Sequence, residues 1–505
     1  MSSVPHRQMY IDGKWTGGEE NHEPYRIIDP ASGDLVATVD RGTVVDADRA
    51  VAAAKAAFNL GEWRRTPVTE RAAVLRRVAE RIAERMDELT LLQSREIGAP
   101  VRLAGAFHIG LPIAHLQYLA DQAELYDFAK TGPEIGPVPA SGLIRREPLG
   151  VCAAIVPWNI PLLLAIWKVA PALAAGNSVV LKPDEKAPLT LVELVREFEA
   201  AGLPAGVLNL VTGDGEDVGA RLVAHPDVRK IGFTGSTTVG KDIMRSAADS
   251  VKRVTLELGG KGPNIVLDDA DLDTAVDGAL FACMAYSGQA CEAGTRLLLP
   301  ASLHDEFVAR LIVRVRTLRL GEPTDPATDL GPLVSRAQQQ RVLEFIEAGR
   351  AAGATVAVGG GVPTGAAFAA GHWVEPTIFT NVTNDMRIAR EEIFGPVLSV
   401  LRYETVDEAV AIANDSDYGL SAGVWSRDES RAVEVAERLE AGMVYINDWH
   451  VISQFYPFGG SKQSGLGREV GPTALDHYTE AKFVSIDRSG GLEGKAYGLV
   501  LSPAS

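Results

Sequence analysis

Short apolar segments alternate with longer helix-like segments through the middle of the chain, from residue 151 to beyond residue 237. The apolar segments predict buried strands, and the segments between them carry apolar residues at helical spacing. Strands that alternate with helices form βαβ units, which build a parallel sheet with helices on both faces. The pattern predicts a doubly wound α/β fold, with strands at residues 151–156, 178–182, 207–211 and 230–233 and helices at residues 162–175, 189–201, 217–224 and from 237 onward.

The alternation restarts after Gly260, with an expected helix at residues 272–286 and expected strands near residues 295–299 and 397–403. A chain of 505 residues is also too long for one simple core. We therefore expect a second α/β domain. The remaining expected elements are amphipathic helices at residues 46–58 and 69–95 and a glycine-rich loop at residues 359–371.

Acidic residues outnumber basic ones, and the formal net charge is −17. Such a chain has no bulk charge for a nucleic-acid backbone, so we expect no nucleic acid partner. The longest apolar stretch, residues 151–175, is broken by prolines and by Lys168, so we expect no membrane span. The N-terminal residues lack the apolar core of a secretory signal, and three cysteines are too few for a disulfide framework. These features favour a reducing cytoplasm.

Two glycine-containing turns are candidate phosphate sites. Gly213, Gly215 and Gly219 follow an expected strand and resemble a dinucleotide-binding fingerprint with one extra residue. They could equally be ordinary turn glycines. The segment Phe233–Thr237 gives a stronger signal, because a strand ends and a helix begins there. The free N–H groups and the positive dipole end of a helix start suit a pyrophosphate.

Lys182 and Glu185 lie three residues apart at the end of the strand at residues 178–182. A lysine at this position can reach a ribose hydroxyl or a phosphate, and a glutamate can bind ribose hydroxyls. Either residue could instead be a solvated surface charge.

Cys291, in Gly288-Gln289-Ala290-Cys291, is the candidate nucleophile. A lone cysteine in an apolar segment is usually inert packing, which is the expectation for Cys152 and Cys283. Cys291 differs because glycine and polar residues precede it and Glu292 follows it. A reactive thiolate also needs a local positive field or a helix N-terminus, which a sequence cannot show.

Glu257 is an acidic residue inside a short apolar, strand-like segment that ends in glycines. Such a carboxylate is either a salt-bridge partner or a group with a raised pKa that suits a general base. The nine histidines show no metal-ligand spacing, so no metal site is expected.

A series of motifs occurs in a fixed order: Pro157-Trp158-Asn159, Leu181-Lys182-Pro183, Phe233-Thr234-Gly235-Ser236-Thr237, Leu256-Glu257-Leu258-Gly259-Gly260-Lys261, Gly288-Gln289-Ala290-Cys291, Glu391-Glu392-Ile393-Phe394-Gly395-Pro396 and Pro457-Phe458-Gly459-Gly460. Together they resemble the NAD(P)-dependent aldehyde dehydrogenase superfamily, from about Tyr10 to Phe483. Their combination in this order is very specific, whereas any one motif alone would not be.

The resemblance implies a cysteine mechanism. Cys291 would be the nucleophile, Glu257 the general base, and Asn159 a donor of the oxyanion hole. Lys168 and Glu469 match a pair that would relay the proton of the base outward. An aldehyde would be oxidised to a carboxylic acid through a thiohemiacetal and a thioester, with hydride transfer to NAD.

The resemblance also implies the binding residues. The expected cofactor-binding residues are Ile155, Pro157, Trp158, Lys182, Glu185, Gly215, Gly235, Ser236, Glu392 and Phe394. The expected substrate residues are Ile160, Leu164, Trp167, Ile452 and Phe458. All of the latter are apolar, which favours medium-length aliphatic or aromatic aldehydes over succinic semialdehyde or betaine aldehyde. Glu185 would repel the 2′-phosphate of NADP, so NAD is the expected cofactor.

The implied fold is aldehyde dehydrogenase-like, with a cofactor domain, a catalytic domain and a small β element for oligomerisation. Residues 1–124 and 150–259 would form the dinucleotide-binding domain and residues 260–462 the catalytic domain. Residues 125–149 and 463–505 would form the oligomerisation element and the C-terminal tail, in a homodimer or homotetramer.

The chain also departs from the family pattern. Glu292 stands where a small or apolar residue is usual, and it could raise the pKa of Cys291 or shape the oxyanion side. Met284, Ile160 and Ser461 stand where other residues are common, and we interpret Ile160 and Ser461 as substrate or packing variation. Two alternatives remain: a relative that transfers the acyl group to coenzyme A, which would not require Glu257, and a non-catalytic binding protein on the same fold.

Overall fold

A computed structural model describes residues 4–18, 22–135, 140–492 and 495–502. Its first sheet has eight strands in the order β22-β12-β11-β8-β9-β10-β2-β3. The strands from β12 to β10 are parallel, and β22, β2 and β3 are antiparallel additions at the two edges. The bounds are β2 Met9–Ile11, β3 Lys14–Thr16, β8 Val151–Ile155, β9 Ser178–Lys182, β10 Leu208–Leu210, β11 Val228–Thr234, β12 Arg253–Glu257 and β22 Gly465–Leu466.

Helices cover both faces of this sheet, as the alternating pattern predicts. Alternate side chains of β8, such as Cys152 and Ala153, enter different clusters because neighbouring residues of a strand face opposite ways. One cluster joins the sheet to α2 (Val68–Glu84), α5 (Leu111–Leu125), α6 (Pro161–Ala174) and α7 (Leu189–Ala200). The other joins it to α1 (Val44–Asn59), α8 (Ala220–Ala224) and α9 (Thr237–Ala248).

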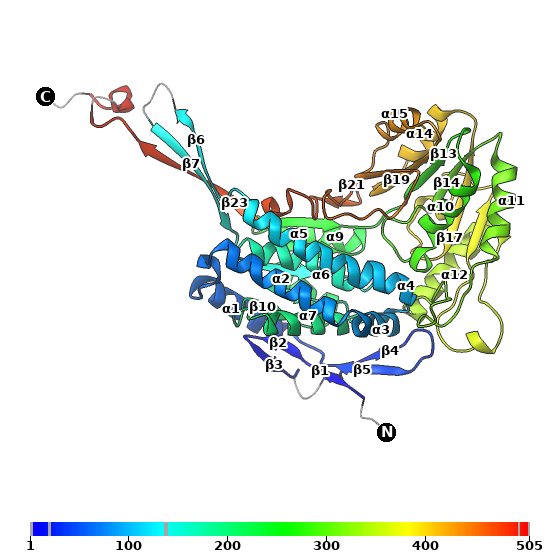
Figure 1. Cartoon of the computed structure of the whole chain (residues 1–505), viewed down its shortest axis with the longest axis horizontal. Coiled ribbons are helices and arrows are strands. Elements are labelled where there is room, and N and C mark those ends of the chain that lie inside the picture. Colours follow the sequence, from blue (N-terminus) through cyan, green and yellow to red (C-terminus); the bar gives the residue numbers. More distant parts are fainter. Residues whose placement is uncertain (1–3, 19–21, 136–139, 493–494, 503–505) are drawn as a thin grey trace.

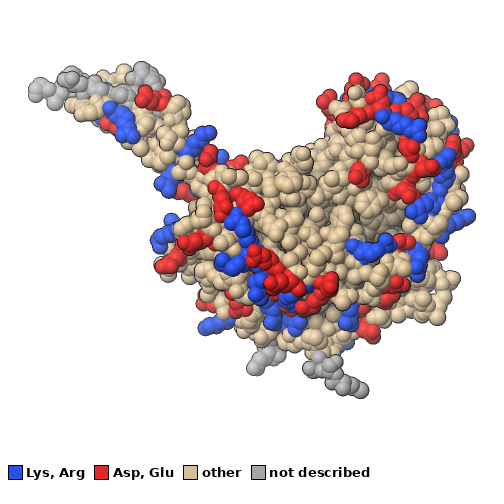
Figure 2. All heavy atoms as spheres, in the orientation of Figure 1, with Lys and Arg blue, Asp and Glu red and all other residues tan. Residues whose placement is uncertain are grey.

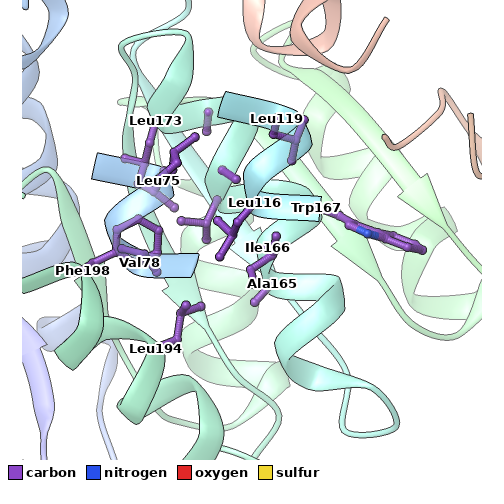
Figure 3. Packing of buried hydrophobic residues seen from close by; sticks show 14 of the residues in the cluster. Leu75, Val78, Leu116, Leu119, Ala165, Ile166, Trp167, Leu173, Leu194 and Phe198 are labelled. Carbon is purple, nitrogen blue, oxygen red and sulfur yellow. The ribbon is translucent and has the colours of Figure 1, made fainter. Parts of the chain in front are cut away.

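The core between the helices of the first face is built from aliphatic and aromatic side chains. Figure 3 shows Leu75 and Val78 of α2 packed among side chains of α5, α6 and α7, with Trp167 at the edge of the group. Residues of α6 are buried along its whole length. This helix carries Lys168 and Trp167, so its packing fixes the position of both.

A second sheet has seven strands in the order β15-β16-β17-β14-β13-β19-β20, all parallel except β15. Helices again cover both faces. The strands are β13 Pro263–Val266, β14 Arg296–Pro300, β15 Thr355–Val358, β16 Thr377–Thr380, β17 Val397–Tyr403, β19 Ser421–Trp425 and β20 Met443–Ile446, and the helices are α10 Leu272–Met284, α11 His304–Val315, α12 Arg336–Ala351, α13 Arg387–Arg390, α14 Val406–Asn414 and α15 Glu429–Ala436. The expected mixed α/β architecture with parallel sheets is confirmed.

A three-stranded antiparallel sheet forms an arm that projects from the body of the molecule (Figure 1). It consists of β6 (Ala129–Ile135), β7 (Ala140–Pro148) and β23 (Thr479–Asp487), with β7 in the middle. A small sheet near the N-terminus contains β1 (His6–Arg7), β4 (Tyr25–Ile28) and β5 (Leu35–Val39). No helix in the described ranges is long and apolar enough to cross a bilayer.

Three expected helices are not single, regular α-helices in the structure. The segment 69–95 forms two helices, α2 and α3 (Met86–Ile97), separated at Arg85. The segment 217–224 begins as a π-helix at Gly215–Gly219 and continues as α8. In the segment 272–286 the α-helix ends at Met284, because the residues after Met284 do not have α-helical backbone angles.

Candidate active site

Cys291 lies in a tight turn after α10. Tyr286 and Ser287 both have a φ of 52°, a left-handed conformation that is unusual for residues other than glycine. Gly288 follows with a φ of 73°, and a Cβ atom there would lie 2.1 Å from the carbonyl oxygen of Gly395. The turn therefore requires glycine at this position, and it presents Cys291 to an apolar cavity.

The cavity beside Cys291 runs between α6 and the loop that follows β20. Every residue expected to contact substrate lines it: Ile160, Leu164, Trp167, Ile452 and Phe458. The ring centroids of Trp167 and Phe458 are 4.7 Å apart, so the two rings form part of one wall. The further lining residues are Leu103, Phe107, His108, Asn159, Leu163, Phe281, Ala285, Tyr286, Ala290, Glu292 and His450.

Asn159 lies at the same cavity, just before α6. Its Nδ2 atom donates a hydrogen bond to the carbonyl oxygen of Gln289, at 3.1 Å. This bond holds the amide group of Asn159 against the loop that carries Cys291. An amide N–H in this place can donate to an oxyanion formed on a carbonyl carbon attached to Cys291.

Glu257 ends β12, and its side chain is buried. Burial raises the pKa of its carboxyl group well above the usual value, and the nearby charge of Glu469 raises it further. Glu257 is not among the described residues that line the cavity beside Cys291 or the cavity at the strand ends. A Cβ atom on Gly459 would lie 2.6 Å from its Oε1 atom, so the carboxyl group is directed toward Gly459.

Lys168 and Glu469 form a buried ion pair, with 2.8 Å between Nζ and Oε1. The Nζ atom of Lys168 also donates to the hydroxyl of Thr234, at 2.6 Å. The charge of Lys168 lowers the pKa of Glu257, which partly opposes the effect of burial. Glu257, Lys168 and Glu469 are therefore electrostatically coupled, as a proton relay requires.

Burial raises the pKa of the Cys291 thiol well above its usual value, and the charge of Glu292 is the next largest cause. The direction agrees with the effect expected for an acidic residue after the nucleophile. Cys152 and Cys283 are buried away from this cavity, and burial raises the pKa of each to about 12. Neither thiol lines this cavity, so neither can react with an aldehyde bound there.

A second, elongated cavity lies at the carboxyl ends of β8, β9 and β11, where open α/β sheets bind their ligands. Most residues expected to bind the cofactor line it: Ile155, Pro157, Trp158, Lys182, Glu185, Gly215, Gly235 and Ser236. Gly219 lines it as well, whereas Gly213 does not. Gly213 has a φ of 135°, so its role is to form the turn.

This cavity has the features that a dinucleotide needs. Ser236 caps α9, because its side chain accepts a hydrogen bond from the N–H of Val239 at 3.3 Å. The positive end of the helix thus opens onto the cavity beside Gly235, where a Cβ atom would lie 2.5 Å from the Phe233 ring. Lys182 is buried at the cavity wall, with its pKa lowered by burial.

Glu392 and Phe394 come from the second half of the chain. The Phe394 ring meets the Trp158 ring edge to face at 5.4 Å, which places Phe394 at one end of the second cavity. Glu392 is turned toward the backbone, and its Oε1 atom accepts from the N–H of Gly260 at 3.0 Å. Burial raises the pKa of Glu392 to about 7.

Glu185 forms an ion pair with Lys186, with 2.6 Å between Oε1 and Nζ. Burial is the largest single effect and raises the pKa of Glu185, but the charge and the hydrogen bond of Lys186, together with the charge of Lys182, lower it more, so the pKa lies below its usual value. Glu185 is therefore a carboxylate at neutral pH, and it faces the cavity at the strand ends.

The comparisons with known proteins fit this geometry. The family model of the aldehyde dehydrogenase family matches residues 15–484. The chain belongs to this family. A curated relative of this aldehyde dehydrogenase, the "Putative aldehyde dehydrogenase DhaS" of Bacillus subtilis (strain 168), is 44% identical over 485 residues, which are 95% of the chain and 96% of the relative.

Solved structures support the same relationship. Betaine aldehyde dehydrogenase from Staphylococcus aureus in complex with NAD⁺ is 40% identical with a TM-score of 0.94, and the alignment covers 96% of each chain. The NAD⁺ complex of an aldehyde dehydrogenase from Bacillus cereus is 41% identical with a TM-score of 0.92, over 96% of this aldehyde dehydrogenase and 97% of that chain.

Some polar residues of the cavity beside Cys291 are absent from the sequence-based site. His108 and His450 line it, and Tyr445 contacts Glu292 from behind. The sequence carries no signal for these three residues, because their roles depend on contacts between segments that are distant along the chain. No cluster of histidine, cysteine and carboxylate side chains that could hold a metal ion occurs in the described part of the chain.

Proposed function

We propose that this aldehyde dehydrogenase oxidises an aldehyde to a carboxylic acid with NAD, through a thiohemiacetal and a thioester on Cys291. One observation carries the proposal: Cys291 and Asn159 line one apolar cavity, and Trp158, next to Asn159 in the sequence, lines the dinucleotide-type cavity. A substrate carbonyl and a cofactor can therefore approach the same sulfur atom from two sides.

The residues of the chain divide the chemistry between them. The proton of the Cys291 thiol passes to solvent water, and the thiolate sulfur adds to the carbonyl carbon, which leaves a negative charge on the carbonyl oxygen. The amide N–H of Asn159 and the backbone N–H of Cys291 stabilise that charge, each by about 3 kcal/mol. NAD, when bound, accepts the hydride that leaves the carbon atom.

Glu257 removes a proton from the water that hydrolyses the thioester. For this step its side chain turns from Gly459 toward Cys291, and its raised pKa makes the carboxylate a stronger base than an exposed glutamate. Lys168 and Glu469 then pass the proton outward. Lys182, Glu185, Gly235 and Ser236 would hold the adenosine and pyrophosphate parts of NAD, and Glu392 and Phe394 the nicotinamide part.

The substrate proposed is a medium-length aliphatic, terpenoid or aromatic aldehyde. No lysine or arginine occurs among the described residues that line the cavity, so a substrate carboxylate would have no counter-charge. Burial of one methylene group contributes about 0.8 kcal/mol, so kcat/KM should rise several-fold for each added carbon until the cavity is full. Succinic semialdehyde and betaine aldehyde would be poor substrates.

We also propose the domain division and the assembly that the sequence suggests. Residues 1–124 and 150–259 form the cofactor domain, residues 260–462 the catalytic domain, and residues 125–149 and 463–505 the oligomerisation element and tail. The arm exposes Ile144, Phe483 and Ile486, and the concave face beside it in Figure 2 carries few charged side chains. A second copy would cover these groups in a homodimer or homotetramer.

The free thiols suit a reducing compartment, and we propose the cytoplasm.

A panel of aldehydes tests the proposed function. The purified enzyme is mixed with NAD and with straight-chain aldehydes of increasing length, benzaldehyde, succinic semialdehyde and betaine aldehyde, and reduced nicotinamide is followed by absorbance. The expected products are free acids without added coenzyme A. Turnover that depends on coenzyme A would favour the acyl-transferring alternative, and the absence of any turnover would favour a binding protein.

A further inference from the structure

The cavity beside Cys291 is not uniformly apolar. Besides Asn159, three polar side chains that are almost completely buried line it: Glu292, His450 and His108. Buried polar atoms normally have hydrogen-bond partners, because an unpaired one costs about 1–3 kcal/mol. Both ring nitrogens of His108 and the Nε2 atom of His450 have no partner among the described protein atoms. These nitrogens are therefore candidates for a contact with the substrate.

Glu292 is held rigidly behind the nucleophile. Its carbonyl oxygen accepts from the indole N–H of Trp449 at 2.9 Å and from the hydroxyl of Ser421 at 2.8 Å. One oxygen of its carboxylate accepts from the hydroxyl of Tyr445, and the other lies 3.0 Å from Nδ1 of His450. Both the main chain and the side chain of Glu292 are thus fixed from several directions.

The contact with Glu292 determines which nitrogen of the His450 ring carries the proton. A carboxylate only accepts hydrogen bonds, so the proton of the shared bond belongs to Nδ1 of His450. The Nε2 atom remains free for a ligand, as an acceptor in the neutral ring and as a donor in the protonated ring. Phe281 meets the edge of the ring at 5.1 Å and limits its rotation.

His108 adds a second polar group to the same cavity. It lies on a π-helix, Ala104–Gly110, a rare backbone form that is often found at functional sites. Burial lowers the pKa of His108 to about 3, so the ring is neutral at physiological pH and offers one donor and one acceptor. Its ring meets the edge of the Tyr286 ring at 5.2 Å.

We propose that His450, oriented by Glu292, and His108 form a polar subsite that binds a hydroxyl group on the tail of the aldehyde. A hydroxyl both donates and accepts, so it can bind either form of the His450 ring. A tail carboxylate would be repelled by Glu292, and a trimethylammonium tail could not hydrogen-bond to the histidines. This inference rests on the proposed function and narrows its substrate class to neutral hydroxyaldehydes with an apolar body.

Two aldehydes of the same shape test the subsite. In para-hydroxymethylbenzaldehyde a hydroxyl replaces the terminal methyl group of para-ethylbenzaldehyde. The wild-type enzyme should prefer the hydroxyl compound, and His450→Phe should lower the ratio of the two kcat/KM values by roughly 3- to 10-fold, as loss of one net hydrogen bond implies. His450→Gln, which keeps a polar side chain, should retain part of the ratio. His304→Phe, at a histidine that does not line the cavity, should leave the ratio near the wild-type value.

A binding measurement covers the case in which a variant does not fold. Calorimetry of the wild-type enzyme without cofactor should show tighter binding of para-hydroxymethylbenzoate than of para-ethylbenzoate. Equal affinities, or a kcat/KM ratio that is the same in wild type and His450→Phe, would overturn the subsite. A preference for betaine aldehyde that Glu292→Gln abolishes would also overturn it, in favour of a cation site. Failure to oxidise para-ethylbenzaldehyde would count against the proposed function and leave the calorimetric result intact.

Discussion

The Nζ atom of Lys168 lies 2.8 Å from Oε1 of Glu469, and the two side chains are only 1% and 2% exposed. Lys168 lies on α6, in the first half of the chain, and Glu469 comes shortly after the edge strand β22, in the second half. The pair therefore joins segments that are far apart in the sequence. It also lies next to the buried carboxyl group of Glu257, whose pKa responds to both charges.

Removal of one partner of this pair should destabilise the protein strongly. Lys168→Met leaves Glu469 buried without a counter-charge, and the expected loss is about 3–5 kcal/mol in the free energy of unfolding. Thermal unfolding followed by circular dichroism measures the effect. The double variant Lys168→Met/Glu469→Gln should lose less than the sum of the single variants, and additive losses would contradict an interaction between the two residues.

Glu257→Gln should separate the two halves of the reaction. Hydride transfer should still occur, but the thioester should accumulate and give a burst of about one reduced cofactor per active site. Cys291→Ala should give no burst. Rapid mixing with absorbance detection distinguishes the two, and steady turnover of Glu257→Gln at the wild-type rate would remove Glu257 as the base.

The same residue should set the acidic side of the pH profile. Burial raises the pKa of Glu257, so its carboxylate form is lost as the pH falls through this raised value. In the wild type, kcat should therefore decline with falling pH in a range where an ordinary glutamate would still be ionised. The burst of Glu257→Gln should lack this dependence, and an identical profile in both proteins would assign the titration to another group.

Glu292→Gln should make Cys291 more reactive. Removal of the negative charge lowers the pKa of the thiol, so more thiolate is present near neutral pH. The rate of alkylation by iodoacetamide should rise several-fold. Glu404→Gln, which removes an exposed carboxylate from another part of the molecule, serves as the control. A slower reaction in Glu292→Gln would show that the carboxylate activates the thiol instead.

Glu185→Ser should weaken the preference for NAD over NADP. Glu185 is ionised and faces the cavity at the strand ends, where it would repel a 2′-phosphate. The ratio of kcat/KM values for NAD and NADP should fall in the variant. Glu216→Ser, at an exposed carboxylate that lines the same cavity, should change the ratio less. A wild-type enzyme that already uses NADP as well as NAD would exclude this role.

Phe483→Asp should weaken the assembly. Phe483 is 62% exposed on the arm, and a charge at that position would have to be buried in an interface. Light scattering should give the wild type a mass that is a multiple of 53.8 kDa and should shift the variant toward 53.8 kDa. Leu60→Asp, at a residue that is 83% exposed outside the arm, is the control. A wild-type particle of 53.8 kDa would refute the proposed oligomer.

The sequence predicts the parallel strands of this fold well. The bounds of β9 and β17 match the expected segments residue for residue, because most residues of a buried strand in a parallel sheet are apolar. The break at Arg85 is not predicted, because the helices on either side of it share one amphipathic pattern. The end of α10 at Met284 depends on the backbone of Tyr286 and Ser287, which no propensity indicates.

The residues of the candidate site also fall into those that the sequence indicates and those that only the structure shows. Cys291 and Glu257 are unusual in their own local segments, and their combination with the ordered motifs indicates the family. His450 and Tyr445 carry no such signal, since they acquire meaning only by their contacts with Glu292. The sequence marks Glu292 as a departure from the pattern, and only the folded structure shows which side chains bind its carboxylate.

The pairing of β23 with β7 joins two segments that the ribosome synthesises at different times. The ribosome synthesises β7 and β12 well before their partners β23 and β22, which lie much further along the sequence. Until those residues emerge, the nascent protein has open sheet edges on both the arm and the first sheet, and such edges are prone to aggregation. A product that terminates before Gly465 would therefore keep most of its core residues and still be a substrate for chaperones and proteases.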